Sequence, residues 1–194
     1  MKKTDNLDKK TDEELVTLTL RDKAHFGFLI DRYESKIFRY IRRITNVPQE
    51  EVEDILQESF LKAYINLNDF DLDLKFSSWI YRITRNQVIS TFRKSKVRPE
   101  GNYIDVEDES LYNIISDSDI EKDIDLQILR KNINKVLNYV EERYREVLVL
   151  KFLEGKDYRE MSDILKKPMG TIATHINRGK QQFREEIEKL KIEL

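Results

Sequence analysis

The chain has 194 residues, of which 37% are charged and 39% hydrophobic, and it contains no cysteine. Without cysteine it forms neither disulfides nor thiolate metal sites, and it has no cysteine nucleophile. No apolar run approaches the roughly 20 residues that span a bilayer, and the first lysines are not followed by the apolar stretch of a signal peptide. We therefore expect a helix-rich, cytoplasmic protein of one or two small domains.

The net charge of -2 conceals an uneven distribution along the chain. Residues 1–96 hold 18 Lys/Arg and 16 Asp/Glu, residues 97–126 hold 2 and 10, and residues 127–194 hold 15 and 11. Two slightly basic blocks thus flank a strongly acidic segment. This pattern predicts two domains, at 21–96 and 127–194, joined by an acidic flexible linker and preceded by a short N-terminal extension, 1–20.

Within the first block, hydrophobic residues recur three times at the spacing of a helix. The three predicted helices cover about residues 26–44, 52–67 and 77–94, and the first ends before Pro48. Their apolar content suffices for one small core. Trp79 is expected in that core, whereas Phe76 fits either the core or the surface.

Helical spacing returns over residues 126–153, and a short helix, a tight turn and a longer helix follow. The short helix covers residues 158–165 and the turn covers 166–170, so Thr171 is expected to cap the longer helix. Helix, short turn and helix is the arrangement of many DNA-reading domains. The sequence therefore predicts an all-α fold whose C-terminal domain is a helix-turn-helix.

Residues 166–184 include five basic side chains and no acidic one. Ile172, Ile176 and Phe183 share one face of the predicted helix, with Gly179 allowing close approach of a neighbour. Small polar and basic side chains then face outward: Ala173, Thr174, Asn177, Arg178 and Gln181. Such a face can enter a major groove, where Asn and Arg read base edges and Lys or Arg binds phosphates. A solvated face of an ordinary helical bundle is the alternative.

A second stretch without acidic residues covers 81–98. On an ideal helix one face of it collects Arg82, Arg85, Asn86, Arg93 and Lys96. Just before it, aromatic side chains mix with a basic one: Phe70, Lys75, Phe76, Trp79 and Tyr81. This combination suits stacking on unpaired bases and tracking of their backbone, unless the aromatic rings are core residues.

The helix of residues 52–67 carries a polar face opposite its apolar stripe, formed by Asp54, Gln57, Glu58 and Leu61. This face is either solvated or docks a basic partner, and its side chains are compatible with both. Catalysis by this chain is not expected, because glycine-rich phosphate loops, H-E-x-x-H and nucleophile elbows are absent. No cofactor and no metal site are expected either.

Four segments together carry a resemblance to a known family. They are Asp54-Ile-Leu-Gln57-Glu58-Ser-Phe60, Phe76-Ser-Ser-Trp79-Ile-Tyr81-Arg-Ile-Thr-Arg-Asn86, Tyr158-Arg-Glu-Met-Ser and Pro168-Met-Gly170-Thr171-Ile-Ala-Thr-His-Ile-Asn-Arg178. In this order and separation they resemble the bacterial sigma-70 family, and more closely its small extracytoplasmic-function (ECF) group. The likeness covers about residues 20–96 and 127–188.

The resemblance implies a subunit that binds core RNA polymerase, directs it to promoters and opens the DNA. It implies a docking helix for the clamp coiled coil of the largest polymerase subunit, at Asp54, Gln57, Glu58 and Phe60. It implies recognition of the -10 element and capture of a flipped non-template base by the loop of about 68–76 and the helix after it: Lys75, Phe76, Arg82, Arg85, Asn86, Arg93 and Lys96. It implies reading of the -35 element by Thr171, Ala173, Thr174, His175, Asn177, Arg178 and Lys180.

Two features depart from the family's pattern. The family often has an aspartate four residues after the asparagine of the -10 helix, where this chain has Ser90. In the -35 helix it commonly has a basic or serine residue at the position of Ala173 and an arginine at that of His175. The promoter sequence must then differ from that of relatives, with Asn177 and Arg178 as the leading base readers.

In this family the connector threads through the polymerase near the template strand and the RNA exit path. The acidic segment would there mimic nucleic acid in a basic channel and be displaced by growing RNA. About 20 residues before the first predicted helix leave no room for the autoinhibitory N-terminal domain of housekeeping relatives. The resemblance therefore also implies control by a separate anti-sigma factor.

Two other classes of function remain as alternatives. An autonomous helix-turn-helix regulator would bind duplex DNA without polymerase, but it has no need of the polar motif at 54–60 or of the aromatic and basic stretch after it. A helical bundle for protein interactions would show little salt sensitivity in any DNA binding, since each phosphate contact adds about 0.9 to the log-log salt slope.

Overall fold

Most residues that the computed structural model describes lie in helices. The structure describes residues 7, 9–95 and 124–192, and these ranges contain no strand. The N-terminal domain comprises α1 (Asp12–Arg21), η1 (Lys23–His25), α2 (Phe26–Ile44), α3 (Gln49–Ile65), η2 (Leu67–Asp69) and α4 (Phe76–Ser95). The C-terminal domain comprises α5 (Ile124–Tyr139), α6 (Glu142–Leu148), the π-helical turn η4 (Val149–Leu153), α7 (Tyr158–Leu165) and α8 (Met169–Leu190). The predicted all-α fold with two helical domains is confirmed, whereas the greater part of the predicted acidic linker lies outside the described residues.

The first helix begins at Asp12, well before the first predicted one. Thr11 caps it, because its hydroxyl accepts a hydrogen bond from the Glu14 amide while the Glu14 carboxylate accepts one from the Thr11 amide. Leu15 and Val16 of α1 are fully buried. Residues 12–21 thus belong to the packed domain and were not expected to do so.

The core of the N-terminal domain forms where α2, α3 and α4 pack against one another. Leu29, Ile37 and Ile41 of α2 are fully buried, as the helical spacing of the apolar residues predicts. Trp79 is also buried, with 8% of its surface exposed, so its expected place in the core is confirmed. The ends of the three predicted helices agree with the structure to within a few residues.

The C-terminal domain contains the predicted helix-turn-helix. Asp157 caps α7 through reciprocal hydrogen bonds with Glu160, and Lys166 ends the helix in the left-handed conformation, with φ of 52°. The N-cap of α8 is Pro168, and the helix begins at Met169. The prediction that Thr171 caps this helix is therefore wrong, since Thr171 already lies in its first turn.

Gly179 explains how closely α8 approaches α6. A Cβ atom at this position would lie 3.1 Å from Cγ of Leu148, closer than carbon atoms normally pack. The predicted close approach at Gly179 is confirmed, and Ile172 and Ile176 are buried on the same side of α8.

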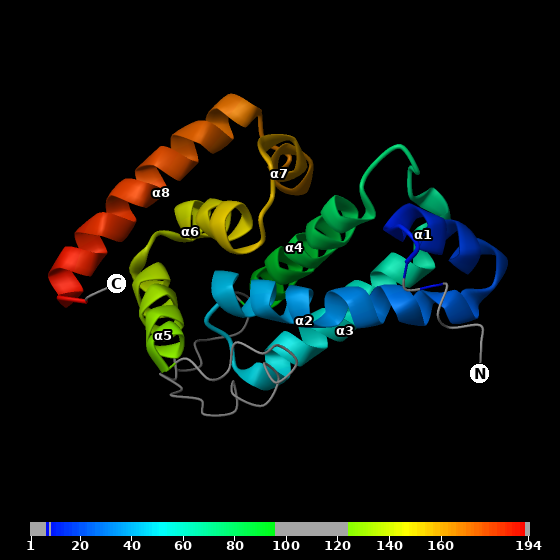
Figure 1. Cartoon of the computed structure of the whole chain (residues 1–194), viewed down its shortest axis with the longest axis horizontal. Coiled ribbons are helices and arrows are strands. Elements are labelled where there is room, and N and C mark those ends of the chain that lie inside the picture. The colour runs from blue at the N-terminus through cyan, green and yellow to red at the C-terminus, as the bar shows by residue number, and fades with distance from the viewer. Residues whose placement is uncertain (1–6, 8, 96–123, 193–194) are drawn as a thin grey trace.

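The two domains lie against each other. In Figure 1, α8 runs along one side of the molecule, α7 lies between α8 and α4, and α6 lies near α2. The buried apolar side chains of both domains form one continuous cluster. In the part of the chain that the structure describes, no helix combines the length and the apolar character needed to cross a membrane.

Candidate nucleic-acid interface

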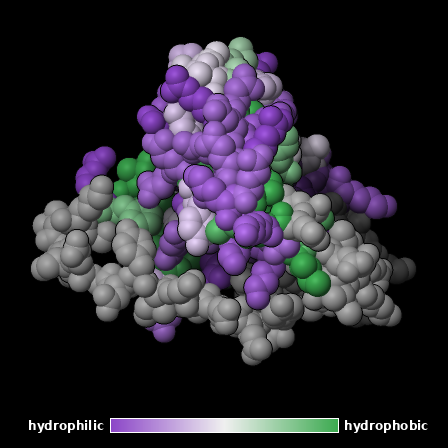
Figure 2. Space-filling view, turned by 90° about the vertical axis from the view of Figure 1, so that its left-hand side faces the viewer, coloured by the Kyte–Doolittle hydropathy of each residue, from purple (hydrophilic) through white to green (hydrophobic). Residues whose placement is uncertain are grey.

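The outer face of α8 presents several of the side chains expected at the -35 element. Asn177, Arg178 and Lys180 are exposed, and Thr174 is exposed while its hydroxyl donates a hydrogen bond to the Gly170 carbonyl at 3.0 Å. The other three expected residues are half-buried: Thr171, Ala173 and His175. Seen from the side on which α8 lies, the described surface is largely hydrophilic (Figure 2). The first turns of α8 thus present polar and basic groups to a ligand outside the domain.

Tyr144 of α6 contacts two of these side chains, Arg178 and His175. Its hydroxyl accepts a hydrogen bond from Nη1 of Arg178 at 3.3 Å, and the guanidinium of Arg143 lies 4.8 Å from its ring centre. The edge of its ring meets the ring of His175, with the centres 5.4 Å apart. This hydrogen bond therefore holds the guanidinium of Arg178 against Tyr144, which is itself buried, with 4% of its surface exposed.

His175 lies in a positively charged surrounding. Burial lowers its pKa below the ordinary value of 6.5, and the nearby cations Lys167, Arg143 and Arg178 lower it further. Its Nδ1 atom is buried and has no hydrogen-bond partner. At neutral pH the imidazole is therefore neutral, so His175 does not supply the positive charge of the arginine that the family commonly has there.

The stripe expected at the -10 element is divided between solvent and the other domain. Asn86 and Arg93 are exposed and Arg82 is half-buried on α4. Arg85 instead points to the C-terminal domain, where its Nε lies 2.8 Å from the Glu146 carboxylate. Lys75 lies just before α4 and pairs with Glu160 at 3.3 Å. Lys96, the last residue of the expected stripe, lies outside the described residues.

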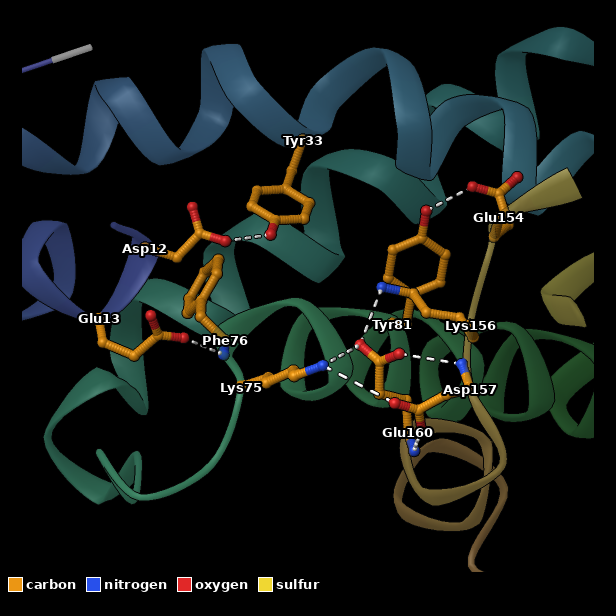
Figure 3. A network of polar contacts seen from close by, with 10 residues as sticks. All are labelled: Asp12, Glu13, Tyr33, Lys75, Phe76, Tyr81, Glu154, Lys156, Asp157 and Glu160. Atoms are coloured by element: carbon orange, nitrogen blue, oxygen red, sulfur yellow. Dashed lines mark hydrogen bonds and ion pairs between the residues drawn. The ribbon is translucent and has the colours of Figure 1, made fainter. Parts of the chain in front are cut away.

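The aromatic residues around the start of α4 form part of the core. Phe76 is fully buried, with its ring centre 5.8 Å from those of Phe70 and Trp79. Tyr81 is 2% exposed. The ring of Phe76 therefore has no free face on which a base could stack in this arrangement, and its contact with DNA stays a prediction. Its backbone amide, which begins the helix, donates to the Glu13 carboxylate at 3.1 Å (Figure 3).

A groove of about 550 Å³ opens between α2 and α3. Its lining is mostly apolar and includes Phe26, Ile30, Leu56, Phe60, Leu61 and Tyr64. Gln57 also lines it, and Asp54 and Glu58 are exposed on the same helix. Phe60 is only 7% exposed and contributes to the wall, while Leu61 is 50% exposed. Two of the four residues expected to dock polymerase, Gln57 and Phe60, thus line this apolar groove, and the other two, Asp54 and Glu58, are exposed on the same helix.

A set of polar contacts joins the two domains and was not found from the sequence. The Glu154 carboxylate accepts a hydrogen bond from Arg43 at 2.8 Å. It accepts another from the Tyr81 hydroxyl at 2.5 Å, which Figure 3 shows. Glu146 accepts from Arg85 and, at 3.1 Å, from the Tyr40 hydroxyl. Burial and the neighbouring Glu154 raise the pKa of Tyr81 well above its ordinary value, so this phenol stays protonated and keeps donating.

Two family models match separate parts of this chain. Residues 29–98 match the family model for Sigma-70 region 2, and residues 130–183 match that for Sigma-70, region 4. The polar and aromatic segments of α3 and α4 fall in the first match, and the helix-turn-helix falls in the second.

Whole-chain similarities lead to a narrower group. The ECF RNA polymerase sigma factor SigW of Bacillus subtilis is 34% identical over 177 residues, which are 87% of this chain and 92% of SigW. The structure resembles CnrH bound to the cytosolic domain of CnrY, with a TM-score of 0.68 and 19% identity over 93% of this chain and 99% of that one. It also resembles the sigma factor RpoE of Bartonella quintana bound to the anti-sigma factor NepR, with a TM-score of 0.67 and 20% identity over 84% of this chain and 96% of that one. The fold thus matches known sigma factors, and the sequence shows that this chain belongs to the ECF sigma factors of RNA polymerase.

Proposed function

We propose that each of the two domains of this sigma factor binds one of the two promoter elements. The N-terminal domain, residues 21–96 together with α1, would bind core polymerase and the -10 element. The C-terminal domain, residues 127–194, would bind the -35 element. The observation that carries this proposal is the helix-turn-helix, whose second helix exposes Asn177, Arg178 and Lys180 on one polar surface.

In the C-terminal domain, α8 would enter the major groove with its first turns. Asn177 and Arg178 would read base edges, because their side chains offer paired hydrogen bonds that differ from base to base. Lys180 would contact phosphate, and Thr171, Ala173, Thr174 and His175 would complete the surface. Tyr144 supports this role by fixing the guanidinium of Arg178 through the 3.3 Å hydrogen bond.

In the N-terminal domain, Arg82, Asn86 and Arg93 would contact -10 DNA from α4, followed by Lys96. Lys75 and Arg85 would join them only after leaving Glu160 and Glu146, since these ion pairs hold both cations against the C-terminal domain. We infer that promoter binding separates the two domains. Release of a flipped base from the duplex costs a few kcal/mol, which phosphate contacts of this kind offset.

The groove between α2 and α3 would dock the clamp coiled coil of the largest polymerase subunit. An exposed Leu61 beside buried Phe60 offers apolar contact, and Asp54, Gln57 and Glu58 offer charge and hydrogen bonds around it. An apolar centre with a polar rim is the usual anatomy of a protein interface. Occupation by a helical partner fits an apolar groove between two helices.

The remaining partners follow from the family. Promoter DNA would be bound both as duplex and as melted non-template strand, and the chain would act by binding energy without bond chemistry of its own. An anti-sigma factor would control it, as NepR binds RpoE in the similar structure. Its place of action would be the cytoplasm, where core polymerase acts.

The decisive experiment adds the purified chain to core RNA polymerase and a library of promoter fragments. A salt-stable complex that starts transcription from a subset of fragments is the expected result, and it yields both promoter elements at once. Duplex binding by the chain alone, with no complex on core polymerase, would instead favour an autonomous regulator and remove the role given to residues 54–60.

A further inference from the structure

A second cavity lies where the two domains meet, apart from the surfaces proposed for DNA and polymerase. Its volume is about 220 Å³, and its walls come from α2, from α4 and from the segment between η4 and α7. Tyr33, Lys36 and Arg39 line it from one side, Tyr81 from α4, and Glu154 and Lys156 from the C-terminal domain. Pockets for drug-sized ligands measure about 300–1,000 Å³, so this one suits a smaller molecule.

The walls of this cavity carry a surplus of positive charge. Three cations, Lys36, Arg39 and Lys156, line it together with one carboxylate, Glu154. That carboxylate is already engaged, since Arg43 donates to one oxygen and the Tyr81 hydroxyl donates to the other. The Tyr33 hydroxyl is also engaged, because it donates to Asp12 (Figure 3). The hydrogen-bond donors left for a ligand are therefore those of the cations and of Ser77, which also lines the cavity.

Lys156 is the most deeply placed of these cations, and only 9% of its side chain is exposed. Its ammonium lies 3.9 Å from the Glu160 carboxylate and 4.5 Å from the ring centre of Tyr81 (Figure 3). These are distances of an ion pair and of a cation-π contact, longer than a hydrogen bond to the ammonium. The ammonium therefore has hydrogens to offer to a group placed in the cavity.

The electrostatic surrounding of Lys156 also favours an anion. Burial lowers the pKa of Lys156 first, the carboxylates of Glu160 and Glu154 oppose this effect, and Lys36 and Lys75 lower the pKa further. The cations around the cavity are thus close enough to repel one another. A bound anion would relieve this repulsion and raise the pKa of Lys156 toward its ordinary value.

We propose that this cavity binds a small oxyanion of the phosphate class, held by Lys36 and Arg39 of one domain and Lys156 of the other. The planar fork of Arg39 fits two oxygens of such an anion, and the ammonium groups add point charges. Because the ligand joins both domains, its binding would hold them together. Held together, the domains would bind promoter DNA less readily. Only this consequence rests on the proposed function, because it assumes that the domains separate on DNA.

Binding is tested by calorimetric titration of the full chain with inorganic phosphate and, in a parallel arm, with pyrophosphate, at constant ionic strength. We expect saturable binding with one site. Arg39→Gln and Lys36→Gln should each weaken it by about tenfold, as the loss of a charge-assisted hydrogen bond does. Neither side chain is buried, so both variants should fold, which circular dichroism checks. Lys135→Gln, an exposed lysine of α5, is the matched control and should bind as the wild type.

The clamping effect is tested by energy transfer between dyes on the two domains. The chain has no cysteine, so Asn68→Cys and Glu188→Cys at two exposed positions give one specific pair of labels. Phosphate should increase the closed population in the otherwise wild-type chain, and with Arg39→Gln the same increase should need about tenfold more phosphate. Non-saturable binding, or equal binding by Arg39→Gln and the Lys135→Gln control, would overturn the proposal. Since polymerase takes no part, failure here is distinct from failure to start transcription.

Discussion

Nε of Arg85 on α4 and a carboxylate oxygen of Glu146 on α6 lie 2.8 Å apart and join the two domains. The Tyr40 hydroxyl donates to the same oxygen from α2. Arg85 is also one of the residues proposed to contact the -10 element. Because only 20% of the Arg85 side chain is exposed beside Glu146, contact between the domains and contact with the promoter compete for this residue.

Removal of the Glu146 carboxylate should loosen the closed arrangement. Glu146→Ala deletes a charge-assisted hydrogen bond between side chains that are 20% and 15% exposed, and such a bond contributes about 1.5–3 kcal/mol. We expect the open population of the free chain to rise by about tenfold or more, measured by energy transfer between the labels at positions 68 and 188. Glu142→Ala on the exposed face of the same helix is the control. An unchanged distance distribution with Glu146→Ala would contradict the competition.

Arg178 should carry sequence discrimination. Arg178→Ala is expected to relax the preference at one promoter position by about 1–3 kcal/mol, measured as affinities of polymerase holoenzyme for single-base variants of the -35 element. Arg184→Ala, an exposed arginine farther along α8, should weaken all variants equally or not at all. If Arg178→Ala instead weakened every variant to the same extent, Arg178 would be a phosphate contact and not a base reader.

Reversal of charge at Glu58 should abolish the association with core polymerase. Glu58 is exposed on α3 beside the apolar groove, so Glu58→Lys leaves the packing of the domain untouched. Co-purification with core polymerase measures the effect, and the urea midpoint of the free chain checks the fold. Asp31→Lys, an exposed charge reversal on α2 outside the four residues expected to dock polymerase, is the control. Retained binding by Glu58→Lys would remove this surface from the proposal.

His175 should make the stability of the C-terminal domain depend on pH. Its pKa is lower in the folded chain than its ordinary value of 6.5, so the unfolded chain takes up a proton first as the pH falls. The free energy of unfolding should therefore decrease as the pH drops below about 6.5 and level off below the folded pKa. Urea titrations between pH 5 and pH 8 measure it.

A His175→Gln variant should lose this slope, because the neutral amide takes up no proton in that range. The chain has two histidines, and the matched control is His25→Gln. The same slope in wild type and His175→Gln would assign the dependence to other groups.

Helical periodicity predicted most of this fold, and local signals explain where it failed. The helix of residues 158–165 was predicted with its observed ends, since a strong apolar stripe is bounded by Asp157 and by a turn. α1 was missed although Thr11-Asp-Glu-Glu14 has the S/T-x-x-E pattern of a capping box. The start of α8 differs from the prediction because Thr171 is a good capping residue, yet the helix begins directly after Pro168.

The candidate surfaces were predicted only in part, because exposure depends on contacts far along the chain. The sequence around Phe76 does not show whether its ring stacks on a base or packs in the core. Its contacts with Phe70 and Trp79 in the structure place the ring in the core. The pair of Arg85 and Glu146 joins residues 61 positions apart. No local pattern marks such a pair, since periodicity reports the face of one helix and not its partner.

The ion pairs between the domains also affect the salt dependence of promoter binding. When the N-terminal domain exchanges the carboxylates of Glu146 and Glu160 for DNA phosphates, Arg85 and Lys75 are neutralised both before and after the exchange. Each phosphate neutralised by a cation that was free before contributes about 0.9 to the slope of log affinity against log salt concentration. The phosphate contacts of Arg85 and Lys75 contribute less, because these cations leave a carboxylate to make them. The logarithm of promoter affinity should therefore fall less steeply with the logarithm of salt concentration than the number of phosphate contacts in the complex implies.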